Sequence, residues 1–328
     1  GTGTCDGPVH TLLADGEDLY VGGVFSQIGG VTSKNIARWN GGAMVAMGFT
    51  SGQGSGVYAL AKPHGVLCAA GYYNGPYWWD GAAWALGPQY IRGNTTGNEI
   101  AALREFQGQL VAGGFFDWAY GPAQYTYWTI RNIARLDADR WMPLGRGISD
   151  PVEGFVEFRG EPYAFGQFRF VNDHPAAKVA RLTDGAWEGI GSDIVGTVWC
   201  AAEFNAVLLL GGTISRVEGS TCQNLVAWDG VQLRPFAPGL GSSSSSIGAM
   251  RVYKGDLYAG GGDFYVPNSP YAQVIVRLVA EMSNWQALAS GLSGGGVKDF
   301  EEFEGDLIAG GSFQNAGAIT ARGIARWN

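Results

Sequence analysis

The stretch Leu19-Tyr-Val-Gly-Gly-Val-Phe25 decides the fold, because it returns at regular intervals along the whole chain. Clear copies are Leu110-Val-Ala-Gly-Gly-Phe-Phe116, Leu257-Tyr-Ala-Gly-Gly-Gly-Asp263 and Leu307-Ile-Ala-Gly-Gly-Ser-Phe313, with weaker copies at 67–73, 163–168 and 207–213. The second glycine of each pair, or its equivalent, stands at 23, 71, 114, 166, 212, 261 and 311, a mean spacing of 48 residues. A fixed period of this size indicates a repeat architecture.

Each repeat carries three further landmarks in the same order. An alternating run with a tight turn, such as 9–16, precedes the glycine pair and predicts a strand and a hairpin. A third strand follows, as in Asn35-Ile-Ala-Arg-Trp-Asn-Gly41, and a fourth carries a tryptophan, as in Trp141-Met-Pro-Leu-Gly145. Four short strands per period are typical of a β-propeller blade.

We therefore predict an all-β chain: a seven-bladed β-propeller with four-stranded antiparallel blades, forming a single domain over 1–328. The last blade is expected to lack its outer strand, or to be completed by residues outside this chain. The glycine pairs are expected near the central channel, and the fourth-strand tryptophans at the outside of each blade, covering the next blade. The predicted blades lie near 7–48, 55–88, 98–145, 151–191, 196–239, 246–289 and 296–328.

Composition supports this fold and excludes other classes of protein. Glycine accounts for 54 of the 328 residues, against a usual share of roughly 7%. The chain also has 12 Trp, 14 Tyr and 16 Phe, which is too much apolar surface for a disordered chain, and it lacks the Gly-X-Y period of collagen. No apolar run approaches the roughly 18 residues of a membrane span, so we expect no membrane insertion.

Charge and cysteine usage bear on partners and location. The net charge of −8, without a basic block, would repel a nucleic-acid backbone. The four cysteines show no CxxC spacing, which excludes thioredoxin-type motifs and zinc ribbons. We expect Cys68 and Cys200 to be buried on strands, place Cys5 and Cys222 at the loop face where they could be oxidised, and assign no disulfide. The low lysine content and Gly/Ser/Thr-rich texture favour an extracellular or cell-surface location.

The combined pattern resembles the kelch-like repeat of the galactose-oxidase central-domain type. It is similar to propellers of large secreted or surface-anchored bacterial proteins and of fungal cortical-marker proteins, and the resemblance covers essentially the whole chain. It implies a propeller fold and a surface scaffold with varied loops. It does not extend to a two-histidine copper site, because the histidines are only His10, His64 and His174, and the first two are expected at different ends of the fold.

Aromatic residues gather in the loops that join the second and third strands of blades 2 and 3. We predict an aromatic platform for a sugar ring or another flat apolar ligand, since such side chains combine a large contact area with a polar tip. The alternative is that they pack on one another to order a long loop, or on a neighbouring domain of a parent protein. The candidate ligand-binding residues are Trp118, Tyr120, Tyr125, Tyr127, Trp128, Tyr73 and Trp78.

Other chemistry is expected to be structural. An arginine recurs in the third strand of five repeats, and this repetition predicts a structural role. We expect each arginine to pair with carboxylates or carbonyls of the neighbouring sheet and to stack on a tryptophan. The candidate acids for glycoside hydrolysis, Asp117, Asp173 and Asp263, lie in loops and are expected to be solvated. The same three acids are the candidates for a structural Ca²⁺ site, but they lack the dense Asp spacing of a calcium loop. We therefore predict no cofactor and assign no metal ligand. The recurring arginines are Arg38, Arg135, Arg181, Arg277 and Arg326.

The resulting prediction is a non-catalytic extracellular or cell-surface propeller module, a binding or structural scaffold within a larger protein or assembly. Its partner would be a protein or glycan at the loop face, or neighbouring domains of a parent protein. One alternative is a carbohydrate-binding lectin or adhesin that uses the aromatic loops of blades 2 and 3. Another is a carbohydrate-active enzyme with acids at the channel mouth.

Overall fold

A computed structural model describes residues 4–49, 55–72, 75–93, 99–121, 127–242, 245–264, 273–279, 284–288 and 291–327. Its regular elements are strands, apart from the short 3-10 turn η1 (Pro63–Gly65), so the all-β prediction is confirmed. Within the described ranges no helix is long and apolar enough to span a membrane. The chain divides into two compact units, one made of 1–48 and 193–328 and the other of 49–192.

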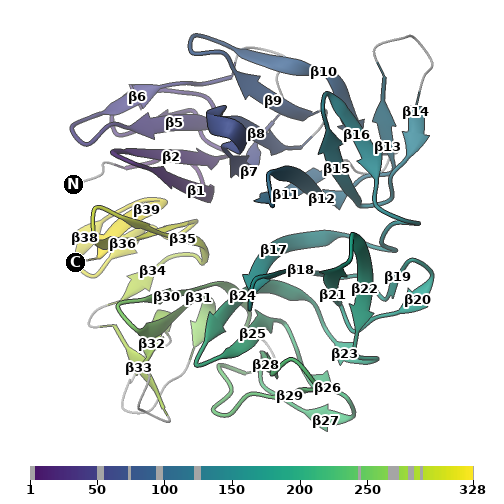
Figure 1. The fold of residues 1–328 in the computed structure, drawn as a ribbon. Helices are drawn as coiled ribbons and strands as arrows, with labels where there is room; N and C mark the ends of the chain where they lie inside the picture. The colour runs from purple at the N-terminus through teal and green to yellow at the C-terminus, as the bar shows by residue number, and fades with distance from the viewer. Residues whose placement is uncertain are drawn as a thin grey trace. The chain divides into compact units, whose positions relative to one another are not determined.

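Within the described residues, the first unit contains four main antiparallel sheets, apart from small hairpin sheets, and their strands follow one another in chain order (Figure 1). In the described residues the last of these sheets has three strands. The first strands of consecutive sheets pack against one another, β24 on β30, β30 on β35 and β35 on β1. The sheets are β1 (Val9–Asp15), β2 (Asp18–Gly23), β5 (Ile36–Trp39), β6 (Met44–Ala46); β24 (Val198–Phe204), β25 (Val207–Gly212), β28 (Leu225–Trp228), β29 (Leu233–Pro235); β30 (Ile247–Tyr253), β31 (Asp256–Phe264), β32 (Gln273–Leu278), β33 (Trp285–Ala287); and β35 (Val297–Phe303), β36 (Asp306–Gly311), β39 (Ile324–Trp327).

The second unit contains three such sheets, with β7 packed on β11 and β11 on β17. One of them has six strands, because the hairpin β13–β14 joins it from the chain segment of the next sheet. The sheets are β7 (Val57–Ala61), β8 (Cys68–Gly71), β9 (Gly75–Trp79), β10 (Trp84–Arg92), β13 (Trp118–Tyr120), β14 (Tyr127–Thr129); β11 (Glu99–Phe106), β12 (Gln109–Phe115), β15 (Ile133–Asp137), β16 (Arg140–Pro143); and β17 (Val152–Phe158), β18 (Glu161–Gly166), β21 (Val179–Thr183), β22 (Ala186–Ile190).

Four of the loops between second and third strands fold into small hairpins. In two cases the segment that leads into the sheet adds a third short strand, and at Cys5 and Ile148 it adds a single bridge. The loops predicted from sequence are therefore partly ordered as strands. These elements are β3 (Gln27–Ile28), β4 (Val31–Thr32); β19 (Phe170–Val171), β20 (His174–Pro175); β23 (Ile194–Val195), β26 (Arg216–Val217), β27 (Ser220–Thr221); and β34 (Leu292–Ser293), β37 (Asn315–Ala316), β38 (Ile319–Thr320).

The recurring second glycine is explained by a β-bulge at the start of each first strand. All seven first strands have this irregularity, as where Ile247 pairs with Gly261 while Ala249 pairs with Gly260. The bulge brings the carbonyl oxygen of Ser246 so close to Gly261 that a Cβ there would overlap it. The close approach at the second glycine is therefore within one sheet, between its first and second strands.

The first glycine of the pair has a different reason. A Cβ on Gly260 would lie 2.9 Å from the Phe300 ring in the next sheet, and a Cβ on Gly113 would lie 2.8 Å from the Phe155 ring. These positions thus allow neighbouring sheets to approach. The requirement for glycine is less strict at this first position than at the second, since one repeat has Ala70 there.

The fourth-strand tryptophans Trp141, Trp187 and Trp285 are buried, but they cover the preceding sheet and not the next one as predicted. Trp285 lies in one apolar cluster with β24, β25 and β28, and its indole N–H donates to the carbonyl of Pro238 at 3.3 Å. Trp141 packs with residues of β7 and β8, and Trp187 with residues of β11 and β12. Each tryptophan therefore closes the outer end of the apolar layer between its own sheet and the one before it.

The four cysteines are free and buried, so no disulfide forms among them. The prediction is confirmed for Cys68 and Cys200. Cys5 and Cys222 are buried as well, and burial raises the pKa of the Cys5 thiol to about 11. Because the thiolate is the reactive species, neither environment favours oxidation.

A buried asparagine in the left-handed region precedes the third strand in several repeats. Asn132 has φ 64, accepts the backbone N–H of Phe116 at 3.0 Å and donates to the carbonyl of Ile148 at 2.9 Å. Asn35 and Asn224 adopt the same conformation. Asparagine tolerates this φ better than other side chains, and here it also ties two loops together.

We expect Asn132→Ala to destabilise the protein by about 2 kcal/mol, because it leaves two buried backbone groups without partners and keeps a strained φ. Urea unfolding measures the change. Lys178, at φ 62 in the equivalent position, offers a matched control. Lys178→Asn should be neutral or stabilising, and an equal loss for both variants would contradict this role.

Candidate functional site

The candidate site is the sheet edge formed by β10, β13 and β14 in the second unit. The later part of β10 pairs with β13, with Tyr90 opposite Tyr120 and Arg92 opposite Trp118. The strand β13 pairs in turn with β14, where Tyr120 is opposite Tyr127. The two aromatic loops predicted for neighbouring blades thus form one continuous sheet.

Residues directly opposite each other in antiparallel strands project from the same face. Tyr90, Tyr120 and Tyr127 therefore share one face, together with Trp118 and Arg92 two positions along. The other face carries the buried Ile91 and Ala119, which belong to the apolar cluster between this sheet and β11–β16. One face anchors the edge, and the opposite face presents the aromatic side chains.

The rings on the presented face form a ladder. The centroids of Tyr90 and Tyr120 are 5.3 Å apart with an interplanar angle of 2°, and those of Tyr120 and Tyr127 are 5.8 Å apart at 33°. The ring of Trp118 stands edge-on to that of Tyr127 at 6.3 Å. The guanidinium of Arg92 lies 6.0 Å from the centroid of Tyr120. We call this set (Tyr90, Arg92, Trp118, Tyr120 and Tyr127) the aromatic ladder.

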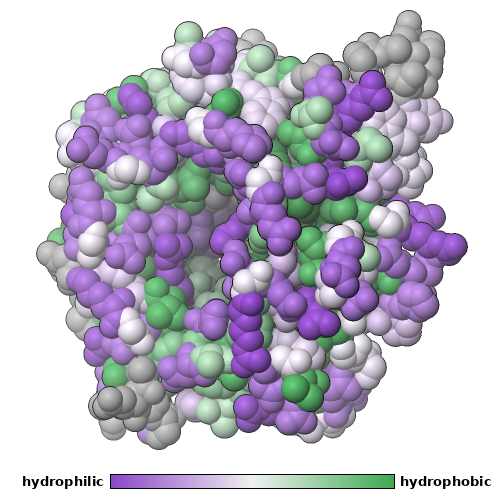
Figure 2. Space-filling model, viewed as in Figure 1, coloured by the Kyte–Doolittle hydropathy of each residue, from purple (hydrophilic) through white to green (hydrophobic). Residues whose placement is uncertain are grey.

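The aromatic ladder is open to solvent. Tyr127 is 59% exposed, Arg92 is also exposed, and the other three side chains are half-buried. In Figure 2 the surface over β13 and β14 is pale, because tyrosine and tryptophan have intermediate hydropathy. Stacking holds the rings in place in the free protein. A ligand that binds them therefore pays little of the entropy cost of ordering side chains.

Sequence reasoning found part of this ladder. Trp118, Tyr120 and Tyr127 are brought together as predicted, whereas Trp128 projects from the opposite face, where its indole N–H donates to the carbonyl of Trp141. Trp78 lies apart, among the residues of a pocket described below. Tyr73 and Tyr125 lie outside the described residues.

Tyr90 and Arg92 were missed because the fourth strand of blade 2 was predicted to end near residue 88. The alternation in Gln89-Tyr90-Ile91-Arg92 was the signal, since it continues β10 by one further pair of outward residues. The pairing with β13 could not be foreseen, because it joins a strand to a loop of another repeat.

The candidate acids for catalysis come from both units: Asp117 and Asp173 lie in the second and Asp263 in the first. Asp173 is exposed and pairs with Arg146 at 2.7 Å, and the hydrogen bond from that guanidinium lowers the pKa of the carboxyl. Asp117 lies in the segment between β12 and β13, and its carbonyl accepts the N–H of Ile130. The side chain of Asp263 is not among those described. Within the same limits, no group of three or more His, Cys, Asp or Glu could hold a metal.

The recurring arginines are structural, as predicted, but their partner stands in their own sheet. Each one faces an acidic or amide residue at the start of the second strand, as Arg38 faces Asp18 at 3.3 Å. The other pairs are Arg135 with Gln109, Arg181 with Glu161, Arg277 with Asp256 and Arg326 with Asp306. These exposed or half-exposed pairs each contribute well under about 1 kcal/mol, so they set register more than stability.

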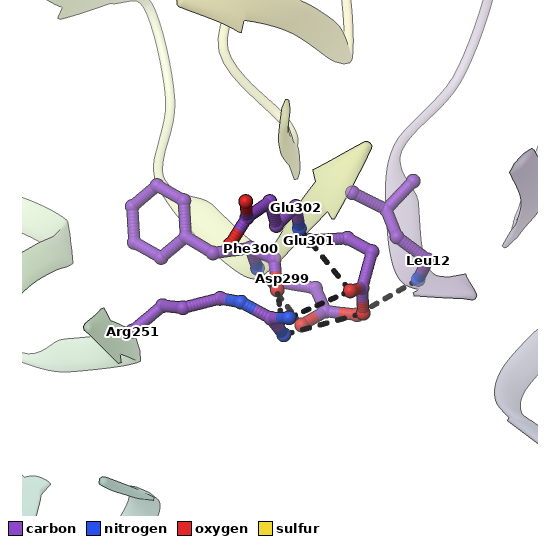
Figure 3. Close-up of polar contacts among 6 residues, drawn as sticks. All are labelled: Leu12, Arg251, Asp299, Phe300, Glu301 and Glu302. Atoms are coloured by element: carbon purple, nitrogen blue, oxygen red, sulfur yellow. Dashed lines mark hydrogen bonds and ion pairs between the residues drawn. The ribbon is translucent and has the colours of Figure 1, made fainter. Parts of the chain in front are cut away.

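A polar network on the first strands of the first unit joins three consecutive sheets (Figure 3). Asp299 on β35 accepts the backbone N–H of Leu12 at 2.7 Å and that of Phe300 at 2.8 Å. Arg251 on β30 pairs with both oxygens of Glu301, at 2.7 and 3.2 Å. Desolvation raises the pKa of Asp299 to about 7. The carboxylates of Asp299 and Glu301 both bind groups of neighbouring strands, so the network serves to link the three sheets.

The comparisons with known proteins concern the fold. No protein-family model matches the chain, and no curated protein matches it in sequence. Over 100% of its length it is similar to the extracellular domain of a putative one-component system from B. thetaiotaomicron, at 15% identity and a TM-score of 0.57, and it spans 40% of that chain.

Two further solved structures are similar over nearly their whole length. One is the computationally designed Ika8 protein, at 11% identity and a TM-score of 0.50, with 100% of this chain and 99% of that one covered. The other is the WD40 β-propeller domain of Doa1, at 10% identity and a TM-score of 0.52, with 99% and 94% covered. These likenesses support a β-propeller fold, and a shared fold at such low identity carries no activity with it.

Proposed function

We propose that the chain is a non-catalytic, extracellular binding module built on a seven-bladed, kelch-like β-propeller. Seven repeats of the bulge and glycine unit support the blade number, and the packing of successive first strands within each unit supports a radial arrangement. The likeness to an extracellular domain of a bacterial sensor supports the location.

The ligand that the aromatic ladder suits best is a glycan, which would make the module a lectin or adhesin. The observation that carries this proposal is the row of Tyr90, Tyr120 and Tyr127 on an exposed sheet face. The opposite face of the same strands is buried in the apolar cluster, which holds the strands in position. Flat, pre-ordered rings offer apolar contact to the faces of pyranose rings, and the phenol hydroxyls and Arg92 offer hydrogen bonds to their hydroxyl groups.

Glycan-array binding of the full chain tests this proposal. We expect Tyr127→Ala and Trp118→Ala to lower the affinity for the best glycan at least tenfold, because each removes a ring from the contact surface, with little effect on thermal stability. The readout is the dissociation constant, measured by calorimetry with that glycan.

Trp128→Ala is the matched control, because Trp128 sits next to Tyr127 but projects into the core side of the edge. The Trp128→Ala variant should have a lower melting temperature, but its folded molecules should bind the glycan with unchanged affinity. Absence of binding to every glycan on the array would exclude the lectin function. Equal effects of Trp128→Ala and Tyr127→Ala on affinity would show that the ladder only orders the loop.

A further inference from the structure

A cavity lies in the second unit, beside the outer strands of its six-stranded sheet and of the sheet β11–β16. It is a half-open pocket with a volume of about 560 Å³, within the roughly 300 to 1,000 Å³ range of small-molecule sites. Its rim includes Gly108, in the turn between β11 and β12, and Asp137 and Asp139, at the turn between β15 and β16. None of the five residues of the aromatic ladder is among the described lining residues, although Gln89 directly precedes Tyr90 in β10.

Two tryptophans give the cavity an aromatic wall. Trp78 on β9 is half-buried and lines the space, and the buried Trp141 on β16 lines it as well. Both pack on the apolar cluster between the two sheets, which fixes their rings. Tryptophan is the aromatic side chain that attracts a cation most strongly over its face.

The charged side chains that line the cavity are acidic. They are Asp137 and Asp139, and no lysine or arginine is among the described lining residues, where His64 is the remaining titratable group. Arg140, next to the rim, lies 4.0 Å from the carboxylate of Asp139, so the attraction for a cation comes mainly from Asp137. A cation is therefore favoured and an anion is disfavoured at this position.

A second, independent observation is that a buried side-chain oxygen of Gln89 lacks a hydrogen-bond donor in the described structure. The side chain lines the cavity, is 5% exposed, and its carbonyl oxygen Oε1 has no hydrogen-bond partner in the described structure. A buried acceptor without a donor costs roughly 1–3 kcal/mol. The terminal torsion of glutamine is soft, so a small rotation would present Oε1 to a donor that enters the cavity.

We propose that this cavity binds a small organic cation with N–H donors, that is, an alkylammonium or guanidinium group on a short chain. The cation lies over the face of Trp78, donates a hydrogen bond to Oε1 of Gln89, and is attracted by Asp137 and Asp139 at the rim. The group could belong to a free amine or to a lysine or arginine side chain of a partner, since both present the same chemistry.

Calorimetric titration of the full chain with 1,4-diaminobutane tests the proposal, with 1,4-butanediol as the neutral probe of the same length. The diamine should bind at least tenfold more tightly than the diol, and raising the salt from 20 to 200 mM should weaken it. Tetramethylammonium, a cation without N–H donors, should bind more weakly than the diamine. N-acetyl-lysine amide separates the two sources: tighter binding than the diamine indicates a side chain, and weaker binding a free amine.

Three variants test the individual contacts. Gln89→Leu should lower diamine affinity about tenfold and keep the fold, because it removes a buried acceptor and preserves the volume. Trp78→Leu should lower affinity about fivefold or more, and Asp137→Asn about threefold with a smaller salt dependence. Asp184→Asn is the matched control, since Asp184 occupies the corresponding turn between β21 and β22 and does not line the cavity.

Trp118→Ala, in the aromatic ladder, should leave diamine binding unchanged, so this test and the glycan test fail independently. Equal binding of diamine and diol would overturn the proposal. So would absence of diamine binding up to 10 mM at low salt, or folded Gln89→Leu and Asp137→Asn variants that bind as the unaltered protein does.

Discussion

Replacing Gly261 with alanine is expected to destabilise the protein by about 3 kcal/mol, although it adds only one methyl group. The new Cβ would overlap the carbonyl oxygen of Ser246, far inside the 3.0 Å that real Cβ atoms respect. The obstacle is backbone, so no side-chain rotation relieves it. The bulge of β30 would have to open, and its pairing with β31 would weaken. Urea unfolding of the full chain measures the loss.

Gly262→Ala is the control for this prediction, because Gly262 is the adjacent residue in the same strand. A Cβ there would meet only the Ser246 hydroxyl oxygen, at an ordinary 3.8 Å. We expect the free energy of unfolding of this variant to change by less than about 0.5 kcal/mol, since its new methyl group meets no steric clash. Similar unfolding midpoints for the two alanine variants would refute the bulge as the reason for the recurring glycine.

The second large effect concerns pH and the first strands of the first unit. Desolvation raises the pKa of Asp299 from 3.8 to about 7 in the folded protein. Between about pH 4 and 7 the folded state therefore keeps a proton that the unfolded state has lost, and stability falls as the pH rises. The size is on the order of 3 kcal/mol, since each pKa unit corresponds to about 1.4 kcal/mol and Asp299 is only partly buried.

His10 on β1 acts in the opposite direction over nearly the same interval. Desolvation and the nearby Lys298 lower its pKa from 6.5 to about 4, so the unfolded state binds a proton that the folded state rejects. Stability then rises between about pH 4 and 6.5, by a similar order of magnitude. The two slopes offset each other, and we expect the unaltered protein to show little net pH dependence in this window.

Single substitutions should separate the two slopes. Asp299→Asn should leave stability that rises with pH from 4 to 6.5, and His10→Gln should leave stability that falls from pH 4 to 7. Glu302→Gln, on the exposed side of the same strand β35, should leave the profile unchanged. The measurement is the urea midpoint at half-unit pH intervals. A flat profile for Asp299→Asn would contradict the raised carboxyl pKa.

The candidate site was only half predictable, for a physical reason. The alternation of aromatic residues around Trp118 and Tyr127 indicates a surface with large side chains, and the structure places both on one face. Adjacent Trp128 looks the same in sequence. Its position on the opposite face depends on the register of β14 with β13 and of β13 with β10, where Trp128 stands opposite the buried Ala119. Backbone hydrogen bonds form these pairings, so the side-chain sequence does not reveal them.

The Asp299 network and the cavity beside Gln89 show the same limit. Leu12 and Asp299 are 287 positions apart, and nothing in either repeat marks their contact. Gln89 and Trp141 come from different repeats; the tryptophan recurs in other fourth strands, whereas Gln89 stands in the later part of β10, outside the shared pattern. Contacts between repeats that differ from one another cannot be derived from what the repeats share.

The sequence by itself determined the all-β class, the period of 48 residues and the strand order within each repeat, because these depend on local alternation, turn residues and self-similarity. The tertiary structure decided which carbonyl makes the second glycine necessary, which sheet each tryptophan covers, and which aromatic residues share the exposed face. Those facts depend on pairing and packing between segments far apart in the chain, where the close approach of two backbones or two sheets selects among side chains that local sequence leaves equivalent.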